Sequence, residues 1–353
     1  MLVPDESAWA GELVPIAPVP GSVSMFVVGV NDNNVVTGSY TTADGQRHGF
    51  FGTIDGNYQT FDYPTGLTIG RSVDNDGYIV GSANPSDGHI YGEPFLRAPD
   101  GTMTTITRNG AVVDGLAQGL RDNGRFMGED WTYRKNFRHL RVLGFYGNGS
   151  EYGKELLLPF HTDKVRPRGF NKHGDVVGLF HDKKVGDTPA FLIRDGVATA
   201  IRFPDPQAFY TYFEEITDKG RIAGFWTDYT QMNAMGVFVY DERKEAFDSF
   251  DVPHTSYLSA QGINSADVVA VTADDSAYLY CMHKAGCPQS ADAVEVKERW
   301  ISARDTVQRL PCKQGCTAPA KTSREPQPDT SDIRSAIAND PVSRFELGIV
   351  RHR

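Results

Sequence analysis

Short extended runs of apolar and β-branched residues, separated by turns of Asn, Asp and Gly, fill the chain up to about residue 280. The stretch 72–81 is typical: a short extended run, an Asp-Asn-Asp-Gly turn and a second run that is rich in β-branched residues. Asn, Asp and Gly tolerate the positive φ that tight turns require, so the pattern predicts a β-hairpin. Altered copies of this hairpin stand at residues 29–38, 119–128, 169–178, 215–224 and 262–271.

A second signal follows each hairpin at the same rhythm. It consists of a small or apolar residue, an aromatic residue and another large apolar residue, and the hairpin ends are 43 to 50 residues apart. A fourth extended run follows, for example Tyr58–Asp62 and Ala198–Arg202. Four strands in about 46 residues match the size of a propeller blade. The six aromatic residues, which we expect to pack between blades, are Phe50, Phe95, Phe145, Phe191, Phe238 and Tyr278.

The sixth unit lacks a fourth strand, because the chain turns into a polar segment after Tyr280. Leu13–Ala17 precedes the first hairpin in the register of a fourth strand, so an N-terminal strand would complete the last blade and close the ring. The sequence therefore predicts an all-β, six-bladed β-propeller over residues 12–281. The number of hairpins argues against five or seven blades.

The C-terminal part has a different pattern. Val296, Trp300, Ala303, Val307 and Leu310 stand at helical spacing before Pro311, which predicts an amphipathic helix that covers part of the propeller or docks a partner. We expect residues 282–316 to form a Cys-containing helical appendage. Residues 317–353 are expected to form a linker and a flexible tail, with a short helix near residues 332–339.

Composition and charge restrict the partners. Asp plus Glu exceeds Lys plus Arg by 45 to 35, and the resulting net charge of −10 opposes binding to nucleic acid or anionic membrane. No apolar run reaches the roughly 18 residues of a membrane-spanning helix, and no signal peptide is visible. We expect a monomer that is either cytoplasmic or exported after removal of a leader.

The four cysteines lie in the last quarter of the chain. Their clustering and even number favour two disulfides, of unspecified connectivity, that fasten the C-terminal segment. Two alternatives stay open, a zinc site and free thiols, but the spacings Cys-x5-Cys and Cys-x3-Cys fit no usual zinc pattern. The residues are Cys281, Cys287, Cys312 and Cys316.

The first unit resembles a known repeat family. Residues 29–40, then Arg47-His48-Gly49-Phe50 and Thr60-Phe61-Asp62-Tyr63-Pro64, are similar to the HAF-repeat family of extracellular repeats, and the resemblance extends over residues 29–280. It implies a propeller and an extracellular or periplasmic location. His48 is the only histidine kept at the His-Gly-Phe position, so a sixfold role for this histidine is excluded.

One position before each hairpin is polar in five of six units, although a core strand would prefer Val or Ile there. We consider two interpretations. A ring of donors and acceptors would bind a ligand, with Arg71 and Arg168 forked onto a carboxylate or phosphate. Alternatively, the ring makes hydrogen bonds between blades. The six residues are Val28, Arg71, Gln118, Arg168, Glu214 and Gln261.

Aromatic and acidic residues also follow the second strands, on the face where ligands would reach the channel. Such residues suit recognition of a sugar or a flat ring, although ordinary packing explains them as well. The basic segment 133–141 is interpreted as a solvated loop. The loop residues are Tyr40, Asp130, Trp131, His181, Trp226, Asp228 and Tyr229.

No nucleophile elbow, phosphate loop or zinc-protease helix occurs in the sequence, and no cofactor or metal is expected. Two functions remain. The first is a binding or scaffolding propeller for a small molecule, carbohydrate or protein. The alternative is a propeller enzyme, a lyase, hydrolase or isomerase, that uses Arg71, Arg168 and Glu214 with a histidine at the channel mouth. The candidate histidines are His89, His161, His181 and His254.

Overall fold

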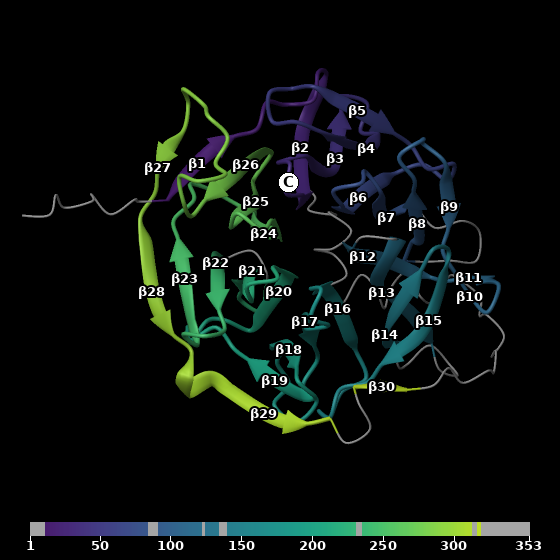
Figure 1. Ribbon diagram of the computed structural model, residues 1–353, viewed down its shortest axis with the longest axis vertical. Coiled ribbons are helices and arrows are strands. Elements are labelled where there is room, and N and C mark those ends of the chain that lie inside the picture. Colours follow the sequence, from purple (N-terminus) through teal and green to yellow (C-terminus); the bar gives the residue numbers. More distant parts are fainter. Residues whose placement is uncertain are drawn as a thin grey trace, which may run out of the picture.

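The computed structural model describes residues 11–83, 91–121, 124–133, 140–230, 235–312 and 316–318. These residues form six β-sheets that stand around a central channel, which confirms the predicted six-bladed propeller (Figure 1). The candidate His89, the middle of the basic segment (residues 134–139) and the predicted linker and tail from residue 319 onward lie outside the described residues.

Each blade has a four-stranded core in which the innermost strand is followed by its neighbours in chain order. Blade 1 contains β2 (Ser22–Val30), β3 (Val36–Thr42), β4 (Arg47–Gly52) and β5 (Tyr58–Phe61). Blade 2 contains β6 (Thr68–Val73), β7 (Ile79–Ala83), β8 (Glu93–Arg97) and β9 (Met103–Thr105). Blade 3 contains β12 (Gly115–Arg121), β13 (Arg125–Tyr133), β14 (Leu140–Asn148) and β15 (Glu151–Leu156), with the short strands β10 (Thr107–Arg108) and β11 (Ala111–Val112) outside them.

The second half of the ring follows the same plan. Blade 4 contains β16 (Val165–Phe170), β17 (Val176–Phe180), β18 (Ala190–Arg194) and β19 (Val197–Ile201). Blade 5 contains β20 (Tyr210–Ile216), β21 (Arg221–Thr227), β22 (Met235–Asp241) and β23 (Ala246–Phe250). Blade 6 contains β24 (Leu258–Ile263), β25 (Val268–Ala273), β26 (Ser276–Cys281) and, as its fourth strand, β1 (Glu12–Pro15).

The N-terminal strand closes the ring as predicted. β1 pairs antiparallel with β26, and Leu13 stands opposite Tyr280. Residues from the two ends of the propeller thereby share one sheet, so the first and last blades cannot separate without breaking this pairing.

Aromatic side chains of the third strands fill the gaps between blades. Phe50 is fully buried and packs with Val268 and Ala270 of the preceding blade, and Phe95 packs against Phe61 and Tyr63. The corresponding side chains of blades 3 to 5 are at most 2% exposed. Burying them between neighbours holds the blades at a fixed spacing.

The predicted helix at residues 290–310 is wrong. The segment instead forms β27 (Val294–Glu295), β28 (Glu298–Ser302), a single 3₁₀ turn (Arg304–Thr306) and β29 (Val307–Pro311), and β30 (Thr317–Ala318) follows. We call residues 294–318 the C-terminal belt. Trp300 is 59% exposed while Ala303 is fully buried, so no apolar helix face exists.

The belt is extended because the outer edges of the blades offer open backbone donors and acceptors. β27 pairs with β1, β28 with β23, β29 with β19 and β30 with β15, all antiparallel. The belt therefore adds a strand to blades 6, 5, 4 and 3 in turn, and it runs around the rim against the order of the blades (Figure 1). The sheets of blades 1 and 2 remain four-stranded.

The turns of the hairpins join neighbouring blades on the face opposite the candidate site. The Oδ1 atom of Asn31 accepts hydrogen bonds from the backbone N–H groups of Asn33 and Val35, and its Nδ2 donates to the Asp74 carbonyl of the next blade at 2.9 Å. Asn264 makes the same turn and donates to the Asn31 carbonyl at 3.0 Å. The repeated Asn thus both forms its turn and fastens one blade to the next.

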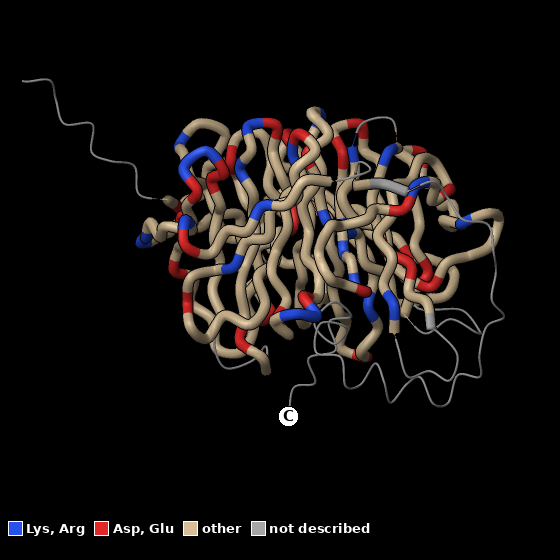
Figure 2. The backbone as a smooth tube through the Cα atoms, turned by 90° about the horizontal axis from the view of Figure 1, so that it is seen from below, with Lys and Arg blue, Asp and Glu red and all other residues tan. Residues whose placement is uncertain are grey.

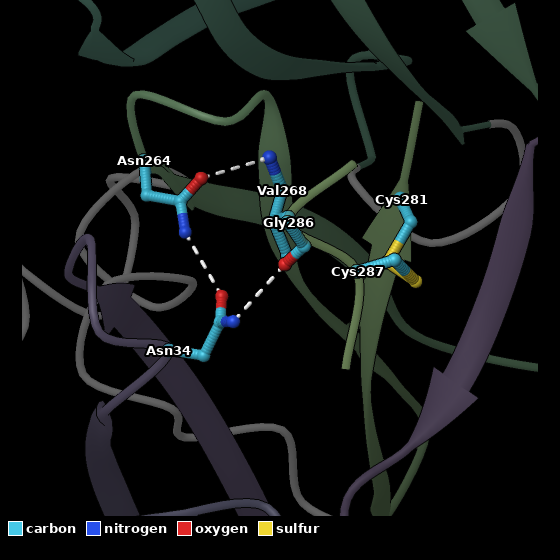
Figure 3. The surroundings of a disulfide bond; sticks show 6 residues. All are labelled: Asn34, Asn264, Val268, Cys281, Gly286 and Cys287. Carbon is cyan, nitrogen blue, oxygen red and sulfur yellow. Dashed lines mark hydrogen bonds between the residues drawn. A yellow bond between two sulfur atoms is a disulfide. The ribbon is translucent and has the colours of Figure 1, made fainter. Parts of the chain in front are cut away.

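Two disulfides, Cys281–Cys287 and Cys312–Cys316, use all four cysteines. The first lies at the joint of blades 6 and 1 (Figure 3). Within its loop, the Gly286 carbonyl accepts a hydrogen bond from Asn34 Nδ2 at 3.1 Å, and Asn34 Oδ1 accepts one from Asn264 Nδ2 at 3.0 Å. The disulfide loop therefore bonds to the first blade across the joint where the ring closes.

Charged residues of both signs are interspersed along the side of the ring that Figure 2 shows. Within the described residues, no helix is long and apolar enough to span a membrane.

Candidate functional site

A β-bulge interrupts the innermost strand of every blade at nearly the same repeat position. A bulge inserts one extra residue and turns its side chain away from the regular alternation. In five blades the extra residue belongs to the predicted ring, and in blade 3 it is the next residue. The bulged residues are Val28, Arg71, Gly119, Arg168, Glu214 and Gln261.

Glycine allows the displaced bulge of blade 3. Gly119 has a φ of +60°, and an added Cβ would lie 2.2 Å from the Arg168 carbonyl oxygen of blade 4. Only glycine fits this close approach without strain. Gln118, directly before it, still lines the small cavity in the channel.

Ring residues of blades 2 to 5 form one network with Glu129 of β13. Arg71 Nη1 donates to Gln118 Oε1 at 3.5 Å, and Gln118 Nε2 donates to Glu214 Oε2 at 2.8 Å. Arg168 forms an ion pair with Glu129, and its Nε lies 3.5 Å from Glu214 Oε2. Each of these links joins two different blades, so the network ties four blades together across the channel.

The network is buried and balanced in charge. Its five side chains are 0 to 5% exposed, and they contain two guanidinium and two carboxyl groups. Burial raises the pKa of Glu214 and lowers the pKa of Arg71. The cavity between the side chains is about 10 Å³, which is room for one water molecule. The geometry therefore favours the inter-blade interpretation of the ring over a ligand site.

The other two ring residues belong to blades 1 and 6. Val28 is 1% exposed, and Gln261 lines the small cavity beside Phe26 and Tyr212. Neither adds a charge. The channel is consequently charged along blades 2 to 5 and uncharged at the ring positions of blades 6 and 1.

The aromatic candidates lie apart from one another, each packed on a neighbour. Trp131 stacks on Tyr91 with ring centroids 3.6 Å apart, and its Nε1 donates to Glu129 Oε2 at 3.0 Å. Trp226 stacks on Phe203 at 5.2 Å and is 9% exposed. For these two side chains, packing explains the residue type.

Tyr40 lies 5.2 Å from the ring of His48, whose Nδ1 is hydrogen-bonded to Asp62 at 2.8 Å. His48 stands on the third strand and Asp62 directly after the fourth, so the His-Gly-Phe and Thr-Phe-Asp segments of the first unit meet in one cross-strand pair. Tyr229 is 62% exposed and packs edge-on against Phe209.

The candidate histidines do not join the ring network within the described residues. His181 follows β17, and its backbone N–H donates to the Lys164 carbonyl at 3.2 Å. His254 precedes β24 in blade 6, where its Nδ1 is hydrogen-bonded to the Val252 carbonyl at 2.9 Å. The carbonyl of His161 accepts a hydrogen bond from Lys183.

The two loop carboxylates have local partners. Asp130 pairs with Arg108 at 2.8 Å, and burial raises the pKa of Asp130 to about 7. Asp228 accepts hydrogen bonds from the Thr230 hydroxyl.

A larger cavity of about 370 Å³ opens between blades 1 and 6. It lies on the predicted ligand face, where β2 and β24 begin and where hairpins join the second and third strands. Its volume falls within the 300 to 1,000 Å³ that ligand sites usually have. Phe26 lines this cavity and also the small cavity of the ring. The other lining residues are Val23, Ser24, Met25, Ser39, Thr41, Arg47, Ser256, Tyr257, Asp274 and Asp275.

One wall of the cavity is apolar and aromatic. Phe26 and Tyr257 meet edge to face with centroids 5.5 Å apart, and Met25 is buried beside Val27 in the same core cluster. The hydroxyl-bearing residues Ser24, Ser39, Thr41 and Ser256 also line the cavity. Such a lining can hold the apolar face of a small molecule while polar groups bind its edges.

Ser39 carries the clearest sign of a ligand site. Its side chain is 1% exposed, and within the described structure its hydroxyl has no hydrogen-bond partner. Buried hydroxyls normally have partners, because an unmade hydrogen bond is costly. Ser39 also lines the cavity.

Asp274 shapes the rim of the cavity. Its two carboxylate oxygens accept hydrogen bonds from the backbone N–H groups of Thr255, Ser256 and Tyr257 and from the hydroxyls of Thr255 and Ser256. Burial alone would raise the pKa of Asp274, but these bonds lower it to about 2. The carboxylate is therefore ionised and already occupied by the loop that it holds.

The sequence-based prediction of the ring considered only the first strand of each hairpin, so it missed Glu129 and Ser82. The Ser82 hydroxyl accepts a hydrogen bond from Arg71 Nε at 3.0 Å. Both directly follow the last residue of a repeat copy, Gly128 and Gly81. Aligning that position gives a polar residue in four of six units, which is a usable signal. The six residues are Ser39, Ser82, Glu129, Leu179, Phe225 and Thr272.

No group of three His, Cys, Asp or Glu side chains in the described parts of the chain is arranged to hold a metal ion.

Comparison with known proteins identifies no family. No protein family matches the chain, and no curated protein matches it. Solved structures with a similar fold include a virginiamycin B lyase from Staphylococcus aureus (12% identity, TM-score 0.45, 77% of this chain and 100% of that chain), a streptogramin B lyase (11%, 0.44, 78% and 99%) and a candidate gluconolactonase (12%, 0.44, 82% and 99%). At this identity the likeness is one of fold, and the HAF-repeat resemblance stays a prediction.

Proposed function

We propose that this protein is a small-molecule-binding propeller whose site is the cavity between blades 1 and 6. The observation that carries the proposal is a cavity of about 370 Å³ whose lining includes Ser39, a residue with a buried hydroxyl that lacks a partner within the described structure. The aromatic wall of Phe26 and Tyr257 and the neighbouring hydroxyls suit a hydroxylated molecule such as a sugar.

Binding accounts for this site better than catalysis does. A general base needs a pKa near the working pH and a free lone pair. Asp274 has a pKa of about 2, and its oxygens are used by the loop. No histidine is among the described residues that line the cavity. A lyase, hydrolase or isomerase is the alternative function, and the lyase and gluconolactonase activities named above belong to the proteins that carry those names.

The proposal is tested by filling the cavity. Ser24 is partly buried on its wall, so Ser24→Trp places an indole inside it. Ser302→Trp, on the exposed rim of blade 5, is the matched control. Purified protein is screened by thermal shift and calorimetry against monosaccharides, sugar acids and sugar phosphates. We expect at least one compound to bind the wild type and the control but not Ser24→Trp. Binding that survives the substitution, or no binding at all, overturns the proposal.

We further propose that the protein works in an oxidising compartment, outside the cytoplasm. The two disulfides support this, because such bonds persist mainly in secreted and periplasmic proteins. Thiol counting on protein isolated without reductant from its native source tests the proposal. Four titratable thiols would contradict it.

A further inference from the structure

The outer edge of blade 5 carries a tryptophan that the fold does not bury. β28 is the outermost strand of this sheet and lies at the rim of the propeller (Figure 1). Trp300, in the middle of β28, is 59% exposed, whereas its neighbour Ile301 packs against a core cluster that includes Phe247. An exposed sheet edge with a large aromatic side chain favours pairing with a further strand.

The backbone of β28 presents donors and acceptors to the outside. In an antiparallel pair, alternate residues direct their N–H and C=O groups toward the partner strand, and the residues between them direct these groups away from it. The Lys297 carbonyl accepts a hydrogen bond from the Asp251 N–H, and the Ala303 N–H donates to the Glu245 carbonyl. Both pairs are in register with the pairing of β28 and β23, so the odd-numbered residues of β28 bond to β23. The even-numbered residues face outward and are Glu298, Trp300 and Ser302.

Two copies of β28 fit each other across a two-fold axis. Full antiparallel overlap places Trp300 opposite Trp300 of the second copy. The same register places Glu298 opposite Ser302, and Arg299 opposite Ile301. Hydrogen bonds are then exchanged through the three outward-facing residues, and no like charges stand directly opposite each other. The two indoles lie side by side on one face of the joined sheet.

The next belt strand lacks this self-complementarity. In β29 the even-numbered residues bond to β19, so Val307, Arg309 and Pro311 face outward. Full overlap of two copies of β29 would put Arg309 opposite Arg309, and Pro311 has no N–H group to donate. β27 and β30 have only two residues each. Of the belt strands in the described part of the chain, β28 is therefore the one that suits pairing with its own copy.

We propose that the protein forms a homodimer in which β28 of one copy pairs antiparallel with β28 of the other, so that the two blade 5 sheets become one. A second copy is the occupant of this edge because the outward donors and acceptors, the charges and Trp300 all match their own copies in one register. The inference departs from the monomer expected from the sequence and does not depend on the proposed ligand. The paired edge is short, so the dimer is weak and forms reversibly as the concentration rises.

Sedimentation velocity of the full-length protein tests the proposal over a series from about 1 µM to about 1 mM. We expect a monomer that converts to a dimer within this range. Trp300→Lys removes the aromatic pair and places two like charges opposite each other, so it should weaken the dimer about tenfold or more.

Two substitutions of Ser302, which is exposed, test the register. Ser302→Lys places an ammonium group opposite Glu298 of the second copy and should tighten the dimer about threefold to tenfold, while Ser302→Glu should weaken it by a similar factor. Gln308→Lys and Gln308→Glu make the same charge changes at an exposed position of β29. These controls should change the affinity by less than about twofold, because salt screens distant surface charges.

Circular dichroism and melting curves establish that each variant is folded. A protein that stays monomeric at every concentration overturns the inference, as does a dimer that Trp300→Lys leaves unchanged. A shift in the same direction by both Ser302 substitutions would also overturn it, because the proposed register requires opposite shifts.

Discussion

The channel uses polar residues in opposite ways along blades 2 to 5 and along blades 6 and 1. Along blades 2 to 5, Arg71, Gln118, Arg168 and Glu214 bond to one another or to Glu129 and leave about 10 Å³ between them. At blades 6 and 1 the corresponding positions are Gln261 and Val28, and a cavity of about 370 Å³ opens between these two blades.

This difference shows that polar residues alone do not locate a binding site. A charged group in a protein interior needs a partner, and in blades 2 to 5 the partners come from the neighbouring blades. A site needs space and at least one polar group that the protein leaves unsatisfied. Among the described residues, blades 6 and 1 combine a cavity of ligand size with an unsatisfied hydroxyl, that of Ser39.

The largest effect is expected from removing the central cation. Arg168→Met leaves Glu129 and Glu214 buried beside an uncharged side chain, so the free energy of unfolding should fall by about 3–5 kcal/mol. Urea denaturation measures this. The control Arg299→Met, at an exposed ion pair, should change stability by no more than about 0.5 kcal/mol. A loss below about 1 kcal/mol for Arg168→Met would mean that the network does not hold the blades.

The second effect concerns the joint that carries the cavity. The double substitution Cys281→Ser/Cys287→Ser opens a loop of seven residues and should cost about 2–3 kcal/mol by the loss of chain constraint. Cys312→Ser/Cys316→Ser, on the far side of the ring, is the matched comparison. Because Gly286 bonds to Asn34 across the joint, only the first pair should also weaken ligand binding. Equal weakening of ligand binding by the two double substitutions would show that the cavity does not depend on the joint of blades 6 and 1.

A smaller effect is expected from a substitution of Ser39, which should raise the stability of the free protein and weaken ligand binding. Ser39→Ala removes a buried hydroxyl that lacks a partner within the described residues, so the free protein should become more stable by about 1 kcal/mol. The same substitution should weaken binding of the ligand found in the screen. Melting curves with and without that ligand measure both effects. A destabilised free protein would show that the hydroxyl is already satisfied.

The smallest effect depends on pH. The folded-state pKa of Asp274, about 2, lies below its ordinary value, so its contribution is complete above about pH 4 and is lost as the pH falls toward 2. After allowance for solvent screening we expect about 1 kcal/mol. Asp274→Asn should therefore be less stable than the wild type at pH 5 and nearly equal at pH 2. A constant difference across this range would contradict the assignment to Asp274.

The sequence predicted the propeller because local turn chemistry repeats in it. Asn31, Asn171 and Asn264 each start a turn and also bond to the next blade, so the hairpin signal and the ring are produced by the same residues. The N-terminal strand was predictable from the missing fourth strand after Tyr280.

The belt could not be predicted from local pattern. Val296, Trp300 and Ala303 match helical spacing, but extended pairing with distant strand edges decides their conformation. The cavity could not be predicted from the sequence either, because residues of β2, β3 and β4 meet the hairpin of Asp274 only after the ring closes. The bulges concentrated polar side chains at the channel, and the sequence pointed to those residues without showing that they bind one another.

The belt also bears on biosynthesis. Residues 294–318 leave the ribosome after all the residues of the six blade cores have been made, and they cover the outer strands of blades 6, 5, 4 and 3. Until then, β1, β23, β19 and β15 present open edges that can recruit strands from other chains. A product truncated before residue 294 would keep these edges exposed. Completion of the chain is thereby coupled to protection from aggregation.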